Sequence, residues 1–190
     1  MIIFIFLLFL ASLTIAIGVF LYLSIFVVSL LKSRIPLVPA RDVVLETLPI
    51  LMPLSPGSHF YDLGAGDGRV VSAMAKAYPE SVCIGIETGP YPYLISRWRS
   101  FLNPLPNATI RYTDFYKASI QDATHVYLYL FPKVIQKLMP RLLKTLAPGT
   151  HIISCDYPYV GQEPLKVMSI SPGPLCHTLY LYEVPEEYPL

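Results

Sequence analysis

The chain has 190 residues, of which 54% are hydrophobic and 14% are charged, and its formal net charge is +1. A charge so close to zero argues against an electrostatic nucleic-acid-binding surface, so we expect no nucleic-acid partner. The three cysteines lie in apolar segments far apart in the sequence. We expect them to be reduced core residues, so the sequence predicts neither a disulfide nor a metal site.

The N-terminal segment, residues 1–31, has no charged side chain and is rich in Ile, Leu, Phe and Val. It exceeds the roughly 20 residues that an α-helix needs to cross a bilayer core. A cleaved signal peptide is the competing interpretation, but no basic residue precedes the apolar run and the run is too long for a signal-peptide core. We therefore expect a transmembrane anchor. Lys32 and Arg34 follow it, which predicts a single-pass membrane protein whose C-terminal part is cytoplasmic.

The segment after the anchor, residues 32–40, contains Pro36 and Pro39, which favour an extended linker. A linker of this length reaches at most about 35 Å, so the part of the chain that follows must lie close to the membrane. Residues 41–190 are long enough to bury one core and show no internal repeat. We expect them to form one domain that begins with a helix over residues 41–52.

From residue 59 onward, strand-like and helical patterns alternate, which predicts a parallel sheet with helices on both faces. Two further strand-like runs are joined by a turn too short for a crossover helix, so they should pair antiparallel. The expected fold is α/β, a doubly wound, mostly parallel seven-stranded sheet with a C-terminal antiparallel hairpin. Pro140 should kink or split the last helix. The strands are expected at residues 59–63, 82–86, 108–112, 125–131, 150–155, 165–170 and 177–184, and the helices at 69–78, 92–102 and 133–146.

A glycine-rich loop follows the first strand, with glycines at three alternate positions. Such glycines allow a sharp turn at the carboxyl end of a strand and let a ligand approach the main chain. A dinucleotide-binding loop would place its third glycine at the position of Arg69, so pyrophosphate binding is disfavoured. The alternative ligand is S-adenosylmethionine, which carries no phosphate. The candidate cofactor-binding residues of the loop are Asp62, Gly64, Ala65, Gly66, Asp67 and Gly68.

Two further acids end the next two strands. Glu87 follows Gly68 by 19 residues, close to the roughly 20-residue offset of an acid that binds ribose hydroxyls. Asp114 ends the third strand, where an acid could accept the adenine amino group. A turn or helix cap is the competing interpretation for Asp114.

Several segments beyond the loop are similar to one protein family in order and spacing. Together they resemble the membrane-anchored class I protein-lysine methyltransferases that modify the adenine nucleotide translocase and the ATP synthase c subunit, with their prokaryotic relatives. The resemblance covers roughly residues 36–164 and implies a Rossmann-like class I fold, S-adenosylmethionine as cofactor and a membrane-protein substrate. The family tends to have Thr where this chain has Arg41, and a basic residue where it has Asp156. The segments are Val38-Pro39-Ala40, residues 62–70, Thr113-Asp114-Phe115-Tyr116-Lys117 and Cys155-Asp156-Tyr157-Pro158-Tyr159.

Lysine methylation requires that the ammonium group lose its proton, which an aromatic, dry channel favours. The carboxyl ends of the fourth and fifth strands carry aromatic residues, where ligands bind in open α/β sheets. The channel candidates are Tyr129, Phe131, Tyr157 and Tyr159, and each has an ordinary core or surface role as its alternative. We expect Tyr129, Tyr157 and Asp156 to be the catalytic residues. Asp156 would accept the proton or attract the ammonium, unless it is a solvated loop residue.

Two other functions remain open at the level of sequence. The same anchor and linker would serve an N- or O-methyltransferase of a lipid or a hydrophobic small molecule. The fold could also be retained by a non-catalytic membrane adaptor, although the intact loop and Glu87 count against this. The fourth strand lacks the Asn/Asp-Pro-Pro-aromatic signature of amide and adenine methyltransferases. Its absence argues against methylation of nucleic acids or of glutamine.

Overall fold

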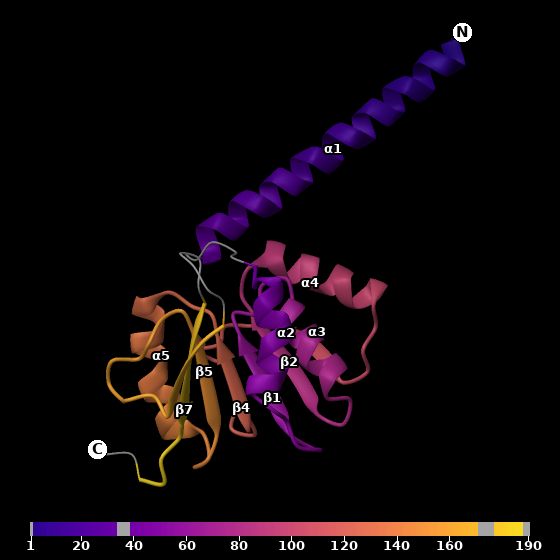
Figure 1. Cartoon of the computed structure of the whole chain (residues 1–190). Helices are drawn as coiled ribbons and strands as arrows, with labels where there is room; N and C mark the ends of the chain where they lie inside the picture. Colours follow the sequence, from indigo (N-terminus) through magenta and orange to yellow (C-terminus); the bar gives the residue numbers. More distant parts are fainter. Residues whose placement is uncertain (1, 34–38, 171–176, 188–190) are drawn as a thin grey trace.

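The structure is a computed structural model that describes residues 2–33, 39–170 and 177–187. Most of the predicted linker and the predicted turn before the last strand lie outside these residues. The helix α1 (Ile2–Ser33) precedes an α/β domain that begins with α2 (Asp42–Leu51). Figure 1 shows α1 projecting away from this domain.

One seven-stranded sheet forms the centre of the domain, in the order β3-β2-β1-β4-β5-β7-β6. β7 pairs antiparallel with both β5 and β6, and all other neighbours are parallel. This confirms the predicted mostly parallel sheet with its C-terminal antiparallel hairpin. The strands are β1 (His59–Leu63), β2 (Val82–Glu87), β3 (Ala108–Tyr112), β4 (His125–Leu128), β5 (His151–Cys155), β6 (Lys166–Ser169) and β7 (Thr178–Glu183).

Helices cover both faces of the sheet, as the alternation predicts (Figure 1). One face packs against α2 and α3 (Arg69–Ala77), and the other packs against α5 (Pro132–Thr145). Of the kink or split expected at Pro140, the split is wrong, because α5 continues through this residue. Met139 and Leu142, on either side of Pro140, are fully buried against the sheet. This burial offsets the backbone hydrogen bond that proline cannot donate.

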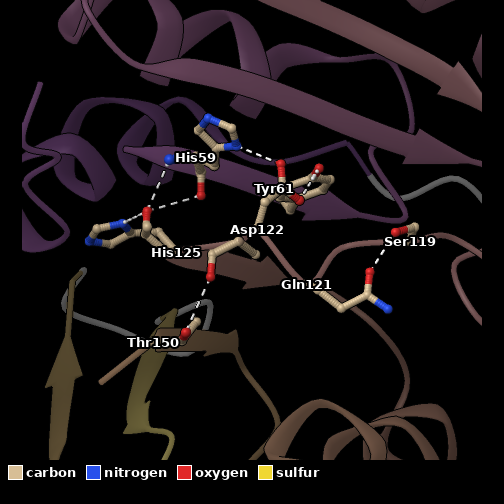
Figure 2. A network of polar contacts seen from close by, with 9 residues as sticks. His59, Tyr61, Ser119, Gln121, Asp122, His125 and Thr150 are labelled. Atoms are coloured by element: carbon tan, nitrogen blue, oxygen red, sulfur yellow. Dashed lines mark hydrogen bonds and ion pairs between the residues drawn. The ribbon is translucent and has the colours of Figure 1, made fainter. Parts of the chain in front are cut away.

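A polar network closes the amino ends of β1 and β4, as Figure 2 shows. The Asp122 carboxylate lies 2.6 Å from His59 Nδ1 and accepts a hydrogen bond from the Tyr61 hydroxyl at 2.9 Å. The Thr124 hydroxyl lies 2.8 Å from His125 Nδ1. This network satisfies polar groups at the amino ends of the strands, the edge of the sheet opposite to the glycine loop.

The helix α4 (Pro90–Leu102) lies beside β2 and β3 and also meets α1. The hydroxyls of Tyr22 and Tyr91 are 3.3 Å apart, and the ring of Phe26 packs edge-on against Tyr91 with centroids at 5.8 Å. The segment Ile2–Val28 of α1 is long and apolar enough to cross a membrane. Residues 2–23 of α1 are exposed, and the contacts described between α1 and α4 involve Tyr22 and Phe26.

Candidate functional site

A cleft lies at the carboxyl ends of β1, β2 and β4. Its walls include the loop after β1, the segment that follows β4, and Pro39 and Ala40, which precede α2. This is the edge at which ligands bind in open α/β sheets. Of the residues predicted from the sequence, those lining the cleft are Asp62, Gly64, Ala65, Gly66, Asp67, Glu87, Tyr129, Phe131 and Tyr157.

The glycine loop turns through backbone conformations that L side chains rarely adopt. Gly64 and Gly66 have φ angles of +89° and +55°. A Cβ on Gly64 would lie 2.8 Å from Leu130 Cδ2, another residue of the cleft wall. Gly68 has φ +77° and stands at the start of α3, outside the lining, where a Cβ would meet Ser96 of α4 at 3.2 Å. Gly68 therefore lets α3 and α4 approach each other.

The buried carboxylate of Glu87 ties the end of β2 to the loop. Its Oε2 accepts a hydrogen bond from the Gly66 N–H at 2.8 Å, and its Oε1 accepts one from the Gly89 N–H at 2.6 Å. Each contact uses one lone pair of one carboxylate oxygen, so each oxygen keeps a further acceptor site for a hydroxyl donor. This arrangement fits the predicted binding of ribose hydroxyls.

The Asp67 side chain holds the loop to two arginines. Its Oδ2 accepts hydrogen bonds from Arg69 Nε at 2.9 Å and from Arg99 Nη2 at 3.0 Å. Arg99 belongs to α4 and also donates to the Asp67 carbonyl at 3.1 Å. Charge-assisted hydrogen bonds, which are stronger than neutral ones, thus connect α4 to the glycine loop.

The Asp62 carboxyl group is almost fully buried at the base of the cleft. Within the described residues it has no hydrogen-bond donor, and burial together with the nearby Glu87 and Asp67 raises its pKa well above the ordinary value. The neighbouring Tyr127 hydroxyl is also buried without a hydrogen-bond partner among those residues. Such groups are costly unless a ligand satisfies them. The site therefore suits a ligand that brings a cationic, hydrogen-bonding group, such as the amino-acid end of S-adenosylmethionine.

Like Gly68, the predicted residues Asp114 and Tyr159 lie outside the cleft lining. The Asp114 side chain is outside the lining and accepts a hydrogen bond from the Tyr116 N–H at 2.8 Å, which caps the turn after β3. Its neighbour Phe115 lines the cleft instead. Tyr159 is buried in the core beside Tyr182, so the structure does not place it in a channel. The position of a residue at the end of a strand predicts that it lies near the site. The backbone conformation after the strand then decides which side chain enters the cleft.

Asp156 lies outside the cleft lining and close to Tyr129, which forms an aromatic wall of the cleft together with Tyr157. It has φ +66°, and its carboxylate lies 2.8 and 3.0 Å from His177 Nδ1 and accepts a hydrogen bond from the Thr178 N–H. Burial, with the nearby Asp156 as the next cause, raises the pKa of Tyr129 to about 12. Tyr129, which lines the cleft near Asp156, thus stays a neutral hydroxyl.

Sequence reasoning missed Tyr127 and His177. Tyr127 lies on β4 two residues before Tyr129, which directly follows the strand, and this spacing places both on the same side of the sheet, a signal that was available in the sequence. His177 directly precedes β7, and no local pattern connects it to Asp156. Only the antiparallel pairing of β5 with β7 brings the two together.

Asp156 and His177 also form a group with Cys155 in which the potential metal-ligand atoms lie within 4.8 Å of one another. The carboxylate and the imidazole already bond to each other. Burial raises the pKa of the Cys155 thiol to about 12, which disfavours the thiolate that binds metals. The absence of a metal therefore stays a prediction, and the donor chemistry here favours a hydrogen-bonded pair.

The known proteins to which this chain is similar are methyltransferases. The family model described as the ANTKMT methyltransferase domain matches residues 62–166. A protein-lysine N-methyltransferase from Saccharolobus islandicus is 30% identical over 159 residues, a match that covers 80% of this chain and 96% of that protein. The lysine N-methyltransferase of the ATP synthase c subunit from Rattus norvegicus is 29% identical, with 72% of this chain and 62% of that protein covered.

A solved structure supports the same assignment. The crystal structure of an RNA methyltransferase from Salinibacter ruber in complex with S-adenosyl-L-homocysteine is 32% identical, with a TM-score of 0.73, and the match covers 80% of this chain and 97% of that one. The fit of the cleft to the cofactor, the family match and these relatives agree. The chain belongs to the family of ANTKMT methyltransferase domains and is an S-adenosylmethionine-dependent methyltransferase.

Proposed function

We propose that this protein spans a membrane through α1 and methylates a lysine side chain of an integral membrane protein. The observation that carries the proposal is the position of the cleft relative to α1. Pro92 of α4 lines the cleft, and its neighbour Tyr91 contacts Tyr22 and Phe26 of α1. A site built beside a membrane anchor meets membrane-bound substrates at a raised effective concentration.

The names of several relatives point to the same substrate class. They include methyltransferases of lysine in the ATP synthase c subunit and in the adenine nucleotide translocase, the latter 30% identical over 143 residues in Mus musculus. Lys32 and Arg34 follow the apolar segment, so we further propose that the catalytic domain faces the cytoplasm. On this reading residues 1–31 are the anchor, 32–40 the linker and 41–190 the catalytic domain.

The cofactor would be held by the residues that line the inner part of the cleft. Glu87 would accept hydrogen bonds from the ribose, Asp62 would pair with the amino group, and the loop from Gly64 to Gly68 would let the ligand approach the main chain. The bound cofactor supplies a methyl group, whose bond to sulfur breaks as the lone pair of the substrate nitrogen forms the new bond. The chain's own task is to align that nitrogen and to exclude water.

The aromatic wall and Asp156 would prepare the substrate amine. Tyr129 and Tyr157 line the cleft, and an ammonium group beside them would lose hydration, which lowers its pKa. Asp156, held by His177 and Thr178, would attract the ammonium and receive its proton through the Tyr129 hydroxyl. In this proposal Asp156 acts on the substrate amine through Tyr129, because Asp156 is not among the residues that line the cleft.

RNA is the substrate class named for the Salinibacter ruber protein, and a lipid is the alternative that the anchor allows. The near-neutral net charge does not favour RNA, whose binding requires neutralisation of phosphates. The test is transfer of radiolabelled methyl from S-adenosylmethionine into native membranes by the full chain, with protein, lipid and RNA fractions counted separately. A Gly66→Val variant, which should not bind the cofactor, is the control.

Label in one protein band that is lost with the variant, and mass-spectrometric location of the methyl group on lysine, would support the proposal. Label confined to lipid or to RNA would overturn it and assign the enzyme to that substrate. Label on another amino acid of a membrane protein would retain the partner and overturn the lysine assignment.

A further inference from the structure

The outer face of α4 carries an exposed apolar stripe, which we call the α4 face. Its members follow the spacing of one helix face, at intervals of three and four residues. Leu94 is 49% exposed, Trp98 64%, Phe101 75% and Leu102 58%. Contiguous apolar surface of this kind on a protein marks an interaction site. Tyr91 continues the stripe toward α1.

The opposite face of α4 is fully engaged with the domain. Pro92 and Ser96 are buried, and Arg99 turns inward to Asp67. The helix is therefore fixed in rotation by packing and by charge-assisted hydrogen bonds, and the apolar stripe cannot turn inward. Because the apolar stripe cannot turn toward the core, only a partner outside the domain can remove it from water.

The contact with α1 gives the level of α4 along the membrane-spanning segment. Tyr22 and Phe26 lie six and two residues before Val28, the end of the 27-residue apolar segment. At 1.5 Å per residue they lie about 9 Å and about 3 Å inside that end. The whole segment is about 40 Å long, roughly 10 Å more than a hydrocarbon core. Tyr91 is thus level with the boundary between headgroups and acyl chains.

We propose that the α4 face lies in this boundary as an in-plane helix whose apolar side chains enter the lipid and whose Arg97 meets anionic headgroups. Amphipathic helices at membrane surfaces bury their apolar side about 5–10 Å into this region. Trp is enriched there, and α4 has an exposed Arg97 and no acidic residue. Figure 1 shows α4 on the side of the domain that faces α1.

The consequence concerns the cleft. Pro92 lines it from the first turn of α4, so a helix lying on the bilayer holds the cleft at a set distance from the lipid surface. α1 alone would fix only one point of the domain, whereas α1 and α4 together fix its orientation. The inference rests on the proposed insertion of α1, and its test reads insertion and the position of α4 separately.

Trp98 is the only tryptophan in the sequence, so its fluorescence reports on the α4 face without labelling. The full chain is reconstituted into phosphatidylcholine vesicles with or without phosphatidylglycerol, and retention after alkaline extraction reads the insertion of α1. Lipids brominated near the headgroup or near the chain end then act as depth-dependent quenchers, and acrylamide acts as the aqueous quencher. We expect lipids brominated near the headgroup to remove most of the Trp98 emission, and acrylamide to have little effect.

Two double variants make the test specific. Phe101→Ser with Leu102→Ser should move Trp98 toward water, raise acrylamide quenching and lower lipid quenching. Leu165→Ser with Val167→Ser removes comparably exposed apolar side chains near β6, at the other edge of the sheet, and should leave both unchanged. Arg97→Glu should weaken lipid quenching most in vesicles that contain phosphatidylglycerol.

Inserted protein whose Trp98 is quenched by acrylamide and not by brominated lipid would overturn the inference and leave the proposed anchor standing. If Trp98 is protected from both quenchers and this protection disappears when the protein is diluted in lipid, the α4 face contacts a second copy of the chain. That result would also overturn the inference. Protein removed by alkaline extraction would overturn both the anchor and the inference.

Discussion

The Gly66 N–H donates a hydrogen bond to Glu87 Oε2 at 2.8 Å, so the residue expected to bind ribose also fixes the glycine loop. Glu87→Ala removes the acceptor for both Gly66 and Gly89 and leaves two N–H groups without their carboxylate. We expect the dissociation constant of S-adenosylmethionine to rise roughly 10- to 100-fold, the equivalent of about 1.5–3 kcal/mol. Isothermal titration calorimetry measures it. Glu80→Ala, at an exposed position before β2, is the matched control, and equal affinities would remove Glu87 from the site.

The positive φ of Gly66 makes this position intolerant of side chains. Gly66→Val should abolish cofactor binding because the loop must leave its conformation, while circular dichroism of the variant stays close to that of the natural protein. Gly149 has φ +80° with open space around its Cβ position, far from the cleft lining. Gly149→Val therefore imposes a similar backbone strain and should bind the cofactor normally. A Gly66→Val protein with unchanged affinity would contradict the loop assignment.

The mostly parallel sheet, its C-terminal antiparallel hairpin and most elements could be predicted, because strand and helix patterns alternate along the chain until the last two strands. The loop could be predicted because Gly64 and Gly66 carry a local backbone requirement. The partners of Asp156 could not, because the contact with His177 depends on the register between β5 and β7. Tyr159 is expected in the channel because it follows the fifth strand, but its burial beside Tyr182 is decided by core packing.

Burial of Asp62 predicts that this residue lowers the stability of the folded protein but strengthens cofactor binding. Its pKa is raised well above the ordinary value in the folded protein, so the folded state binds more protons than the unfolded state above about pH 4, and stability falls as the pH rises through this range. Asp62→Asn removes this cost. In detergent, the variant should unfold at a higher urea concentration than the natural protein at pH 7, with the difference vanishing near pH 4.

The same substitution should weaken cofactor binding, because the neutral amide cannot pair with a cationic amino group. In the natural protein a cationic ligand favours the ionised carboxyl, so binding should release protons and strengthen as the pH rises. Calorimetry in two buffers of different ionisation enthalpy measures the protons released, which should decrease in Asp62→Asn. A variant that is less stable than the natural protein at pH 7 would show that the carboxyl group has a structural partner.

His125 predicts sensitivity to acid. Burial and the nearby ring of His151 lower its pKa to about 4. The unfolded chain takes up a proton near pH 6.5 that the folded protein does not, so stability is lost as the pH falls from about 6.5 to about 4. His125→Asn keeps a polar partner for the Thr124 hydroxyl and removes the titrating ring. The loss in urea midpoint between pH 7.5 and pH 5 should be smaller in the variant, and an equal loss would refute this origin.

The pair formed by Asp156 and His177 predicts how methyl transfer depends on pH. Asp156→Asn retains an oxygen for the Thr178 N–H but removes the charge that we propose attracts the ammonium and takes its proton. At pH 7 we expect the rate of methyl transfer to fall by about 100-fold, in the range of general base catalysis. The deficit should shrink as the pH approaches the lysine pKa of about 10.4, because more of the substrate is already neutral. His177→Asn can still donate a hydrogen bond to Asp156, so its loss should be smaller. A deficit that is the same at every pH, in a variant that binds the cofactor normally, would assign Asp156 to positioning of β5 and β7 alone.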